Sequence, residues 1–129
     1  MYLINERFTQ RIVYVGETSN IVRRYYAHFN SSHDTGSFNQ WCIETGRDKK
    51  GFEVAVLDLT PYETLDMDDR LIVEKALIMC HANTVVNKDK PQSLNAYEME
   101  RYEYITSIVE PEFKPYTQIK VEKMAKKIA

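Results

Sequence analysis

The stretch VYVGETSNIVRRYYAH, residues 13–28, sets the predicted fold of the first half of the chain. It opens on a β-branched and aromatic run that ends at Gly16, which is typical of a strand. The polar residues after Gly16 supply a turn and a helix N-cap, with Ser19 or Asn20 as the capping residue. From Ile21 onward, apolar residues recur at helical spacing. The stretch therefore predicts a strand, a turn and a helix, with Arg24 and His28 facing away from the apolar side.

Short strands and helices alternate along the rest of the predicted structure. The apolar segment at residues 2–4 is separated from the next strand by polar residues, which favours an antiparallel hairpin. Proline and glycine mark the ends of the later elements. These are a short helix at 38–43, a charged turn at 47–51, an apolar central strand at 52–59 and helices at about 66–81 and 94–109. The predicted order is strand, strand, helix, helix, strand, helix, helix and tail.

Length and composition indicate one globular domain. The 129 residues are 43% hydrophobic and 28% charged, which is ordinary for a single compact core. No apolar run approaches the roughly 18 to 20 residues that span a bilayer, and the first residues lack the layout of a signal peptide. We therefore expect a soluble, cytoplasmic protein with no membrane partner. Cys42 and Cys80 lie in predicted helices and are interpreted as small core residues.

Charge is unevenly distributed along the chain. The formal net charge of -2 weakly disfavours a nucleic-acid partner, because phosphate-binding domains are usually basic. Residues 58–74 are acidic, whereas residues 114–129 carry five lysines against Glu122. The basic tail would suit a phosphate backbone, or it is simply a solvated terminal helix.

Tyr14, Arg24 and His28 form the first candidate constellation. A tyrosine at a strand end and an Arg–His pair one helical turn apart would make a polar cluster suited to phosphate. Arginine offers fixed, permanently charged donors, and histidine exchanges protons near neutral pH. The alternative is structural: Arg24 as a solvated helix residue and His28 as a surface or capping residue.

Glu74 is the second candidate, because it lies in the most apolar stretch of a predicted helix. A buried, unpaired carboxylate is costly, so Glu74 needs a cation, either a side chain in a salt bridge or a metal ion. Asn87 follows that helix, where its amide would bind phosphate or orient a neighbouring group.

Together these residues resemble the GIY-YIG nuclease family. The run from Tyr14 to His28 is similar to the second half of that signature: a YIG tripeptide, a Thr/Ser-rich turn, and a helix with an arginine and a histidine or tyrosine four residues later. Tyr2-Leu3-Ile4 stands where the GIY strand would be and keeps only its tyrosine. Glu74 and Asn87 match the later glutamate and asparagine. The resemblance covers roughly residues 2 to 88.

The resemblance implies an α+β fold with a small three-stranded antiparallel sheet flanked by helices. Residues 1–90 would form the nuclease-like core, and residues 91–129 a C-terminal helix and lysine-rich tail that pack on or extend the same domain. The implied activity is hydrolysis of DNA phosphodiester bonds with one divalent ion, Mg²⁺ or Mn²⁺. A homodimer would let a single-site enzyme cut both strands.

The family also implies a role for each site residue. Glu74 would bind the metal, and Arg24 would bind a non-bridging phosphate oxygen. Tyr14 or Tyr2 would orient or deprotonate the attacking water, with His28 accepting the proton. Asn87 would fix Tyr14 or a phosphate.

Two other functions compete with the nuclease interpretation. The first is a nuclease-derived DNA-binding or inhibitory protein without turnover, which the acidic net charge and the incomplete GIY segment favour. The second is a small interaction module in which the match is accidental. Within the nuclease interpretation, the short chain favours a stand-alone restriction-like, phage or mobile-element enzyme. Metal dependence separates the nuclease from both alternatives.

Overall fold

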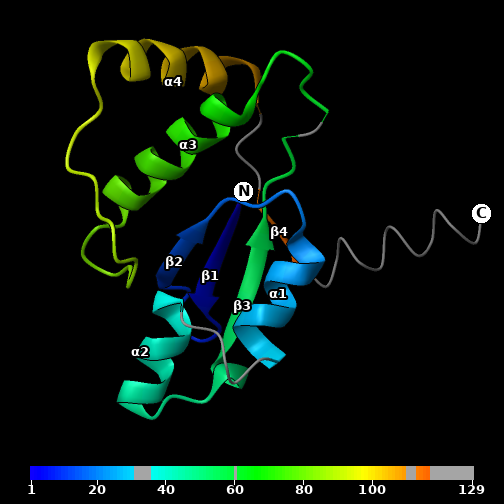
Figure 1. Ribbon diagram of the computed structural model, residues 1–129, viewed down its shortest axis with the longest axis vertical. Helices are drawn as coiled ribbons and strands as arrows, with labels where there is room; N and C mark the ends of the chain where they lie inside the picture. Colours follow the sequence, from blue (N-terminus) through cyan, green and yellow to red (C-terminus); the bar gives the residue numbers. More distant parts are fainter. Residues whose placement is uncertain (31–35, 60, 110–112, 117–129) are drawn as a thin grey trace, which may run out of the picture.

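An antiparallel sheet lies at the centre of the structure, with helices on both of its faces (Figure 1). The computed structural model describes residues 1–30, 36–59, 61–109 and 113–116. Within these ranges the sheet has four strands in the spatial order β2-β1-β3-β4. They are β1 (Tyr2–Glu6), β2 (Ile12–Gly16), β3 (Phe52–Val56) and β4 (Lys114–Pro115).

Four α-helices flank the sheet in the described part of the chain. Helices α1 (Ile21–Asn30) and α2 (Ser37–Thr45) follow the β1–β2 hairpin, and a 3-10 turn at Lys49–Gly51 leads into β3. Helices α3 (Met67–Cys80) and α4 (Ala96–Ile108) pack against each other at the top of Figure 1. The fold is therefore α+β, as the sequence predicted.

Side chains that alternate along the strands pack into two separate apolar cores, one on each face of the sheet. Along β1, Tyr2 and Ile4 pack under α1 and α2, whereas Leu3 packs with α3 and α4. The pairing of β1 with β2 shifts between Ile4 and Asn5, which leaves Val13 as an extra residue on β2. Because both faces of the sheet are covered, its strands are apolar on both sides.

The sheet has one strand more than the three predicted. β4 is two residues long and contains Pro115, so no apolar run in the sequence marks it. It pairs with β3, where Ala55 lies opposite Pro115. β3 is central, as predicted, but it ends at Val56 rather than at Leu59. Leu59 is still buried, which explains why the apolar pattern runs past the end of the strand.

The orientation of α1 differs from the prediction. Asn20 is its N-cap, since its side-chain oxygen accepts from the Arg23 N–H at 3.1 Å. Val22 and Tyr26, assigned to the inner side, are 62% and 61% exposed, whereas His28, assigned to the outer side, is 0% exposed. Spacing alone misplaced the helix face because a buried tyrosine hydroxyl on β1 needs a polar partner, which His28 supplies.

The cysteine interpretation is confirmed for one residue and wrong for the other. Cys42 is buried on α2, whereas Cys80 is exposed at the last position of α3.

Two ion pairs bind α4 to α3. The Asp69 carboxylate accepts from Nε and Nη2 of Arg101 at 2.6 and 2.8 Å, and Nζ of Lys75 donates to Glu98 at 3.0 Å. Asp69 also closes a capping box with Asp66 at the start of α3. Helix α4 thus packs on the first 90 residues, and the predicted lysine-rich tail beyond Tyr116 lies outside the described residues.

Among the described residues, none of the helices has both the length and the apolar character needed to cross a bilayer.

Candidate functional site

The Tyr2 hydroxyl is the centre of a polar cluster under α1. It shares a hydrogen bond of 2.8 Å with Nε2 of His28, and Nε of Arg24 donates to it at 3.4 Å. The ring of Tyr14 lies 5.2 Å from that of His28, centroid to centroid, in an edge-to-face arrangement. The structure thus brings four of the sequence-predicted site residues into direct contact: Tyr2, Tyr14, Arg24 and His28.

The cluster has a buried inner pair and an accessible outer pair. Tyr2 is 1% exposed and His28 is fully buried, whereas Tyr14 and Arg24 are half-buried. Burial, reinforced by the neighbouring Tyr14 hydroxyl, raises the pKa of Tyr2 well above its usual range. Burial alone would lower the pKa of Arg24, but hydrogen bonds to the two tyrosine hydroxyls outweigh it and raise that pKa. Arg24 therefore stays cationic at the mouth of the cluster.

Gly16 makes room for the Tyr2 ring. A Cβ built at Gly16 would lie 2.3 Å from Cζ of Tyr2 and 2.4 Å from its hydroxyl oxygen. The two residues are opposite each other in the pairing of β1 with β2. The absence of a side chain at Gly16 thus lets the Tyr2 hydroxyl lie against the end of β2.

Asn87 fixes the outer edge of β2. Its side-chain oxygen accepts from the Val15 N–H at 3.1 Å, and its side-chain nitrogen donates to the Val15 carbonyl at 2.8 Å. The Val86 N–H donates to the Val13 carbonyl at 2.7 Å along the same edge. Asn87 therefore holds the backbone of Val15, directly after Tyr14, and lies beside the cluster rather than within it.

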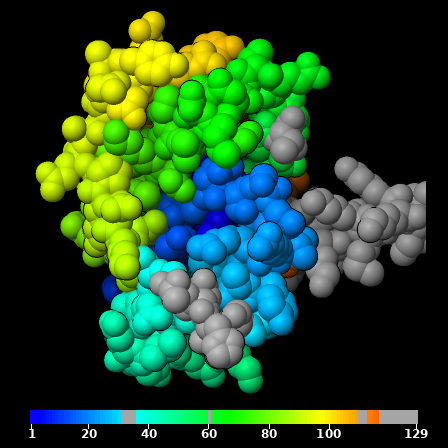
Figure 2. All heavy atoms as spheres, in the orientation of Figure 1, coloured from blue at the N-terminus to red at the C-terminus, as the bar shows by residue number. Residues whose placement is uncertain are grey.

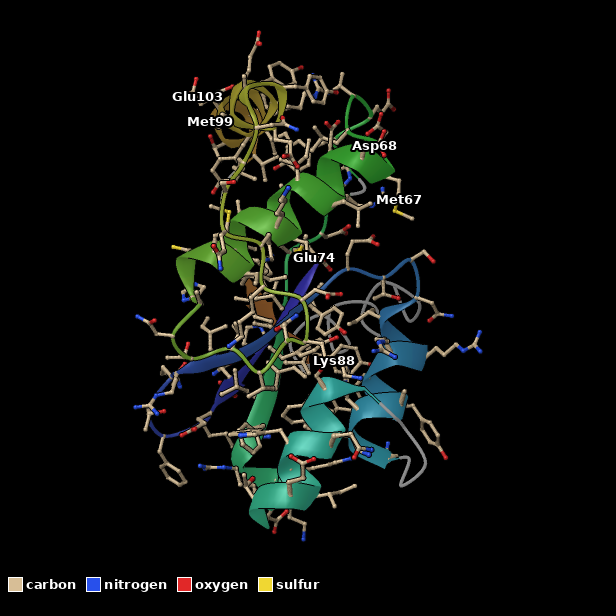
Figure 3. The ribbon with its side chains drawn as sticks, turned by 60° about the vertical axis from the view of Figure 1, so that its left-hand side comes forward. Met67, Asp68, Glu74, Lys88, Met99 and Glu103 are labelled. Carbon is tan, nitrogen blue, oxygen red and sulfur yellow. The ribbon has the colours of Figure 1, made fainter. Side chains whose placement is uncertain are left out.

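Glu74 approaches the same end of β2 from α3, on the other side of the sheet. It is half-buried, and burial raises the pKa of its carboxyl group, as does the nearby Glu17 carboxylate. A hydrogen bond to the Glu17 backbone and the amino group of Met1 act in the opposite direction. Because Glu17 directly follows Gly16, Glu74 and the Tyr2 cluster flank the same turn. Figure 3 shows Glu74 on the side of α3 that faces the strands.

The surface is open between the two halves of the candidate site. In Figure 2, blue atoms of the N-terminal strands are visible between the green atoms of α3 and the light-blue atoms of α1. A ligand at this opening would meet side chains from both layers of helices.

Glu17 is a site residue that the sequence did not single out. Its side chain is 7% exposed and pairs with Nε of Arg70 at 3.0 Å. The acidic residue straight after the YVG run was the available signal, but its partner is 53 positions away in the sequence. Within the described part of the chain, no lysine or arginine forms an ion pair with Glu74. The salt-bridge alternative for Glu74 thus has no partner there.

The carboxylates at this end of β2 fit a hard divalent cation with few protein ligands. Arg70 pairs with Glu17, whereas Glu74 has no lysine or arginine partner in the described part of the chain, and burial together with Glu17 raises the Glu74 pKa. Over the described residues, no group of three or more His, Cys, Asp or Glu side chains is arranged to hold a metal. Mg²⁺ matches such a site because it keeps several waters and binds through one or two carboxylates plus substrate phosphates.

The chain matches no protein-family model, and it has no significant match among curated proteins or among solved structures.

Proposed function

We propose that this protein is a metal-dependent DNA endonuclease that hydrolyses phosphodiester bonds, with its active site at the end of β2. The observation that carries the proposal is the placement of two complementary groups around one turn. On one side lies the tyrosine–histidine–arginine cluster, and on the other the half-buried Glu74 carboxylate, which has no lysine or arginine partner among the described residues. Phosphodiester hydrolysis needs both a cationic donor for the phosphate and a ligand for the ion. The likeness to the GIY-YIG signature supports the same activity.

Arg24 binds the phosphate in this proposal. Its guanidinium lies at the accessible side of the cluster, and its Nε is oriented by the Tyr2 hydroxyl at 3.4 Å. A guanidinium held in this way donates to a non-bridging oxygen and offsets the charge that develops in the transition state.

Tyr14 is the tyrosine that contacts the attacking water. Tyr2 is buried and has a raised pKa, so its hydroxyl is poorly placed to meet solvent or to act as a base. Tyr14 is half-buried beside Arg24 and His28. The Tyr2–His28 pair therefore positions Arg24 and Tyr14 and does not touch the substrate itself.

Glu74 holds Mg²⁺ or Mn²⁺ in this proposal. When bound there, the ion supplies Lewis-acid stabilisation of the phosphate and of the leaving oxygen. Glu17 and Arg70 fix the turn that faces Glu74, and Asn87 fixes the strand that carries Tyr14.

A DNA-binding or inhibitory protein without turnover is the second candidate. The burial of Tyr2 favours it, because one of the two signature tyrosines is out of reach of water. Arg24 and the opening beside it would then serve binding alone.

Cleavage of DNA by matched glutamate variants tests the proposal. Supercoiled plasmid and branched DNA are incubated with Mg²⁺, Mn²⁺ or EDTA, using the wild type, Glu74→Gln and Glu103→Gln. Glu103 lies on the outer side of α4, away from the site, so its variant makes the same chemical change elsewhere (Figure 3).

The nuclease proposal expects nicked or linear product that needs the metal, persists in Glu103→Gln and disappears in Glu74→Gln. DNA binding with no cleavage under any condition would move the assignment to the inactive binder.

A further inference from the structure

A groove lies beside Glu74 between α3 and the segment that follows Asn87. Its volume is about 520 Å³, and it is broadly open to solvent. One wall is a single face of α3, and the other is the segment at residues 88–91. The lining residues are Leu71, Glu74, Lys75, Ile78, Lys88, Asp89, Lys90 and Pro91.

Two lysines in this groove are available to a ligand. Lys75 is held by both oxygens of Glu98, at 3.0 and 3.1 Å. Lys88 is exposed, and in the described part of the chain its ammonium group makes no hydrogen bond or ion pair. Nζ of Lys90 has a long bond of 3.4 Å to the Ala82 carbonyl, which a stronger acceptor would replace easily.

The backbone next to Lys88 is held in place by its neighbour Asn87. Asn87, immediately before it, is bound through both atoms of its amide to Val15 on β2. Figure 3 shows Lys88 between Glu74 and the helices that cover the other face of the sheet. The lysine therefore lines the groove directly after the residue that holds the edge of β2.

We propose that this groove binds a nucleic-acid strand next to the reacting phosphate, with Lys88 and Lys90 contacting a flanking phosphate. The choice of nucleic acid as the ligand rests on the proposed nuclease function. Leu71, Ile78 and Pro91 supply apolar wall for a sugar or base, and ammonium groups are common phosphate ligands. The groove thus sets the path that the nucleic-acid strand takes along α3, away from Glu74.

Charge in the groove links strand binding to the ion. With Lys75 matched by Glu98, the two lysines Lys88 and Lys90 face the two carboxylates Glu74 and Asp89. The lining is then close to neutral and attracts a polyanion weakly. A divalent cation at Glu74 makes the lining net positive, so DNA binds more tightly when the ion is present.

Binding of a short fluorescein-labelled DNA duplex, followed by fluorescence anisotropy, tests the groove without relying on turnover. It is measured in EDTA and in Ca²⁺ over a range of KCl concentrations. The variants are Lys88→Gln, Lys90→Gln and the double variant. The matched control is Lys49→Gln with Lys50→Gln, which removes the same charge from the 3-10 turn before β3.

Each groove lysine is expected to contribute about five- to tenfold in affinity, and each substitution to reduce the slope of log K against log salt by about 1. The double variant loses both contributions. The control, Lys49→Gln with Lys50→Gln, loses only the affinity that follows from its lower net charge. Ca²⁺ tightens DNA binding by the wild type but not by Glu74→Gln. Equal affinities and slopes for the groove and control variants would overturn the proposal.

The two proposals fail in different ways. A wild type that cleaves DNA while Lys88→Gln and Lys90→Gln bind and cleave normally refutes the groove and leaves the nuclease standing. If the wild type never cleaves DNA, but Lys88→Gln and Lys90→Gln bind DNA more weakly than the wild type and the control, the nuclease proposal is refuted and the groove proposal is supported.

Discussion

Gly16 and Tyr2 compete for the same space at the end of β2. A methyl group at Gly16 would overlap the Tyr2 ring, with Cβ 2.3 Å from Cζ. We expect Gly16→Ala to push the ring off His28 and to lower the free energy of unfolding by about 1 to 3 kcal/mol, the usual cost of overpacking. Gly51→Ala is the matched control, because a Cβ at Gly51 has open space around it. Urea denaturation of both variants checks this, and equal stabilities would contradict it.

The two signature tyrosines should respond differently to loss of the hydroxyl. Tyr2→Phe leaves buried His28 without its 2.8 Å hydrogen bond and should cost about 1 to 3 kcal/mol of stability. Tyr14→Phe removes a half-buried hydroxyl, so it should alter stability little and lower kcat by about 100-fold or more. Unfolding and cleavage are measured on both proteins. The opposite pattern, with Tyr2→Phe stable but inactive, would make Tyr2 the residue that meets the water.

The pH dependence of stability reports on the Glu74 carboxyl group. Burial and Glu17 raise its pKa, so at neutral pH its ionised form destabilises the folded chain. That penalty disappears as the pH falls through the raised pKa toward the ordinary value of about 4.3. In EDTA, Glu74→Gln should therefore be more stable than the wild type at neutral pH, and the difference should shrink on acidification.

Mg²⁺ should stabilise the wild type selectively, by about 1.4 kcal/mol at ten times its dissociation constant, and should not stabilise Glu74→Gln. A Glu74→Gln protein that is less stable than the wild type at neutral pH in EDTA would show that the carboxylate has a stabilising partner instead.

Among the elements, α4 depends on α3 for its position. Asp69 is 2% exposed, completes the capping box of α3 and accepts two hydrogen bonds from Arg101, whose guanidinium is the main reason why the Asp69 pKa is lowered. We expect Asp69→Ala to destabilise the protein by about 1 to 3 kcal/mol, because it removes a buried carboxylate that accepts two charged hydrogen bonds and breaks a capping box. Asp68→Asn, one position earlier and exposed, should change stability by only a few tenths of a kcal/mol.

Acid titration gives an independent check on the same pair. A lowered pKa means that the stabilisation by Asp69 is fully present above its ordinary value of about 3.9 and is lost as the pH falls through the lowered pKa. The stability difference between the wild type and Asp69→Ala should therefore narrow only in strong acid. A difference that stays constant down to the lowest pH would contradict the ion-pair explanation.

The elements also show what the sequence was able to predict. Helix α3 was expected at about 66–81 and runs from Met67 to Cys80, since Asp66 and the apolar spacing mark it clearly. β4 was missed because pairing between distant segments defines it rather than its own two residues. The burial of the His28 side chain was missed for a related reason. His28 points inward because it shares a hydrogen bond with the Tyr2 hydroxyl, 26 positions away, and helical spacing contains no information about that contact.

At the scale of the whole molecule, the candidate site was predicted as a set of residues but not as an arrangement. Tyr14, Arg24 and His28 lie together as expected, and Tyr2 joins them through a contact with His28 that spacing did not predict, whereas Glu74 reaches the same turn from the other face of the sheet. Local motifs predict the first group because it lies within one hairpin and the helix after it. The role of Glu17 and the groove at Lys88 depend on how α3 and the later loop pack, which no short motif encodes.

The segment at Val86 and Asn87 also bears on how copies of this protein can associate. An open strand edge is a template on which another chain can add a strand, and sheets with long open edges aggregate. Here the outer edge of β2 is already bonded by Val86 and by the Asn87 amide, and the strand at the opposite edge is two residues long and includes Pro115. In the described sheet, a second copy therefore meets only the two-residue edge at β4, so strand addition between copies is disfavoured there.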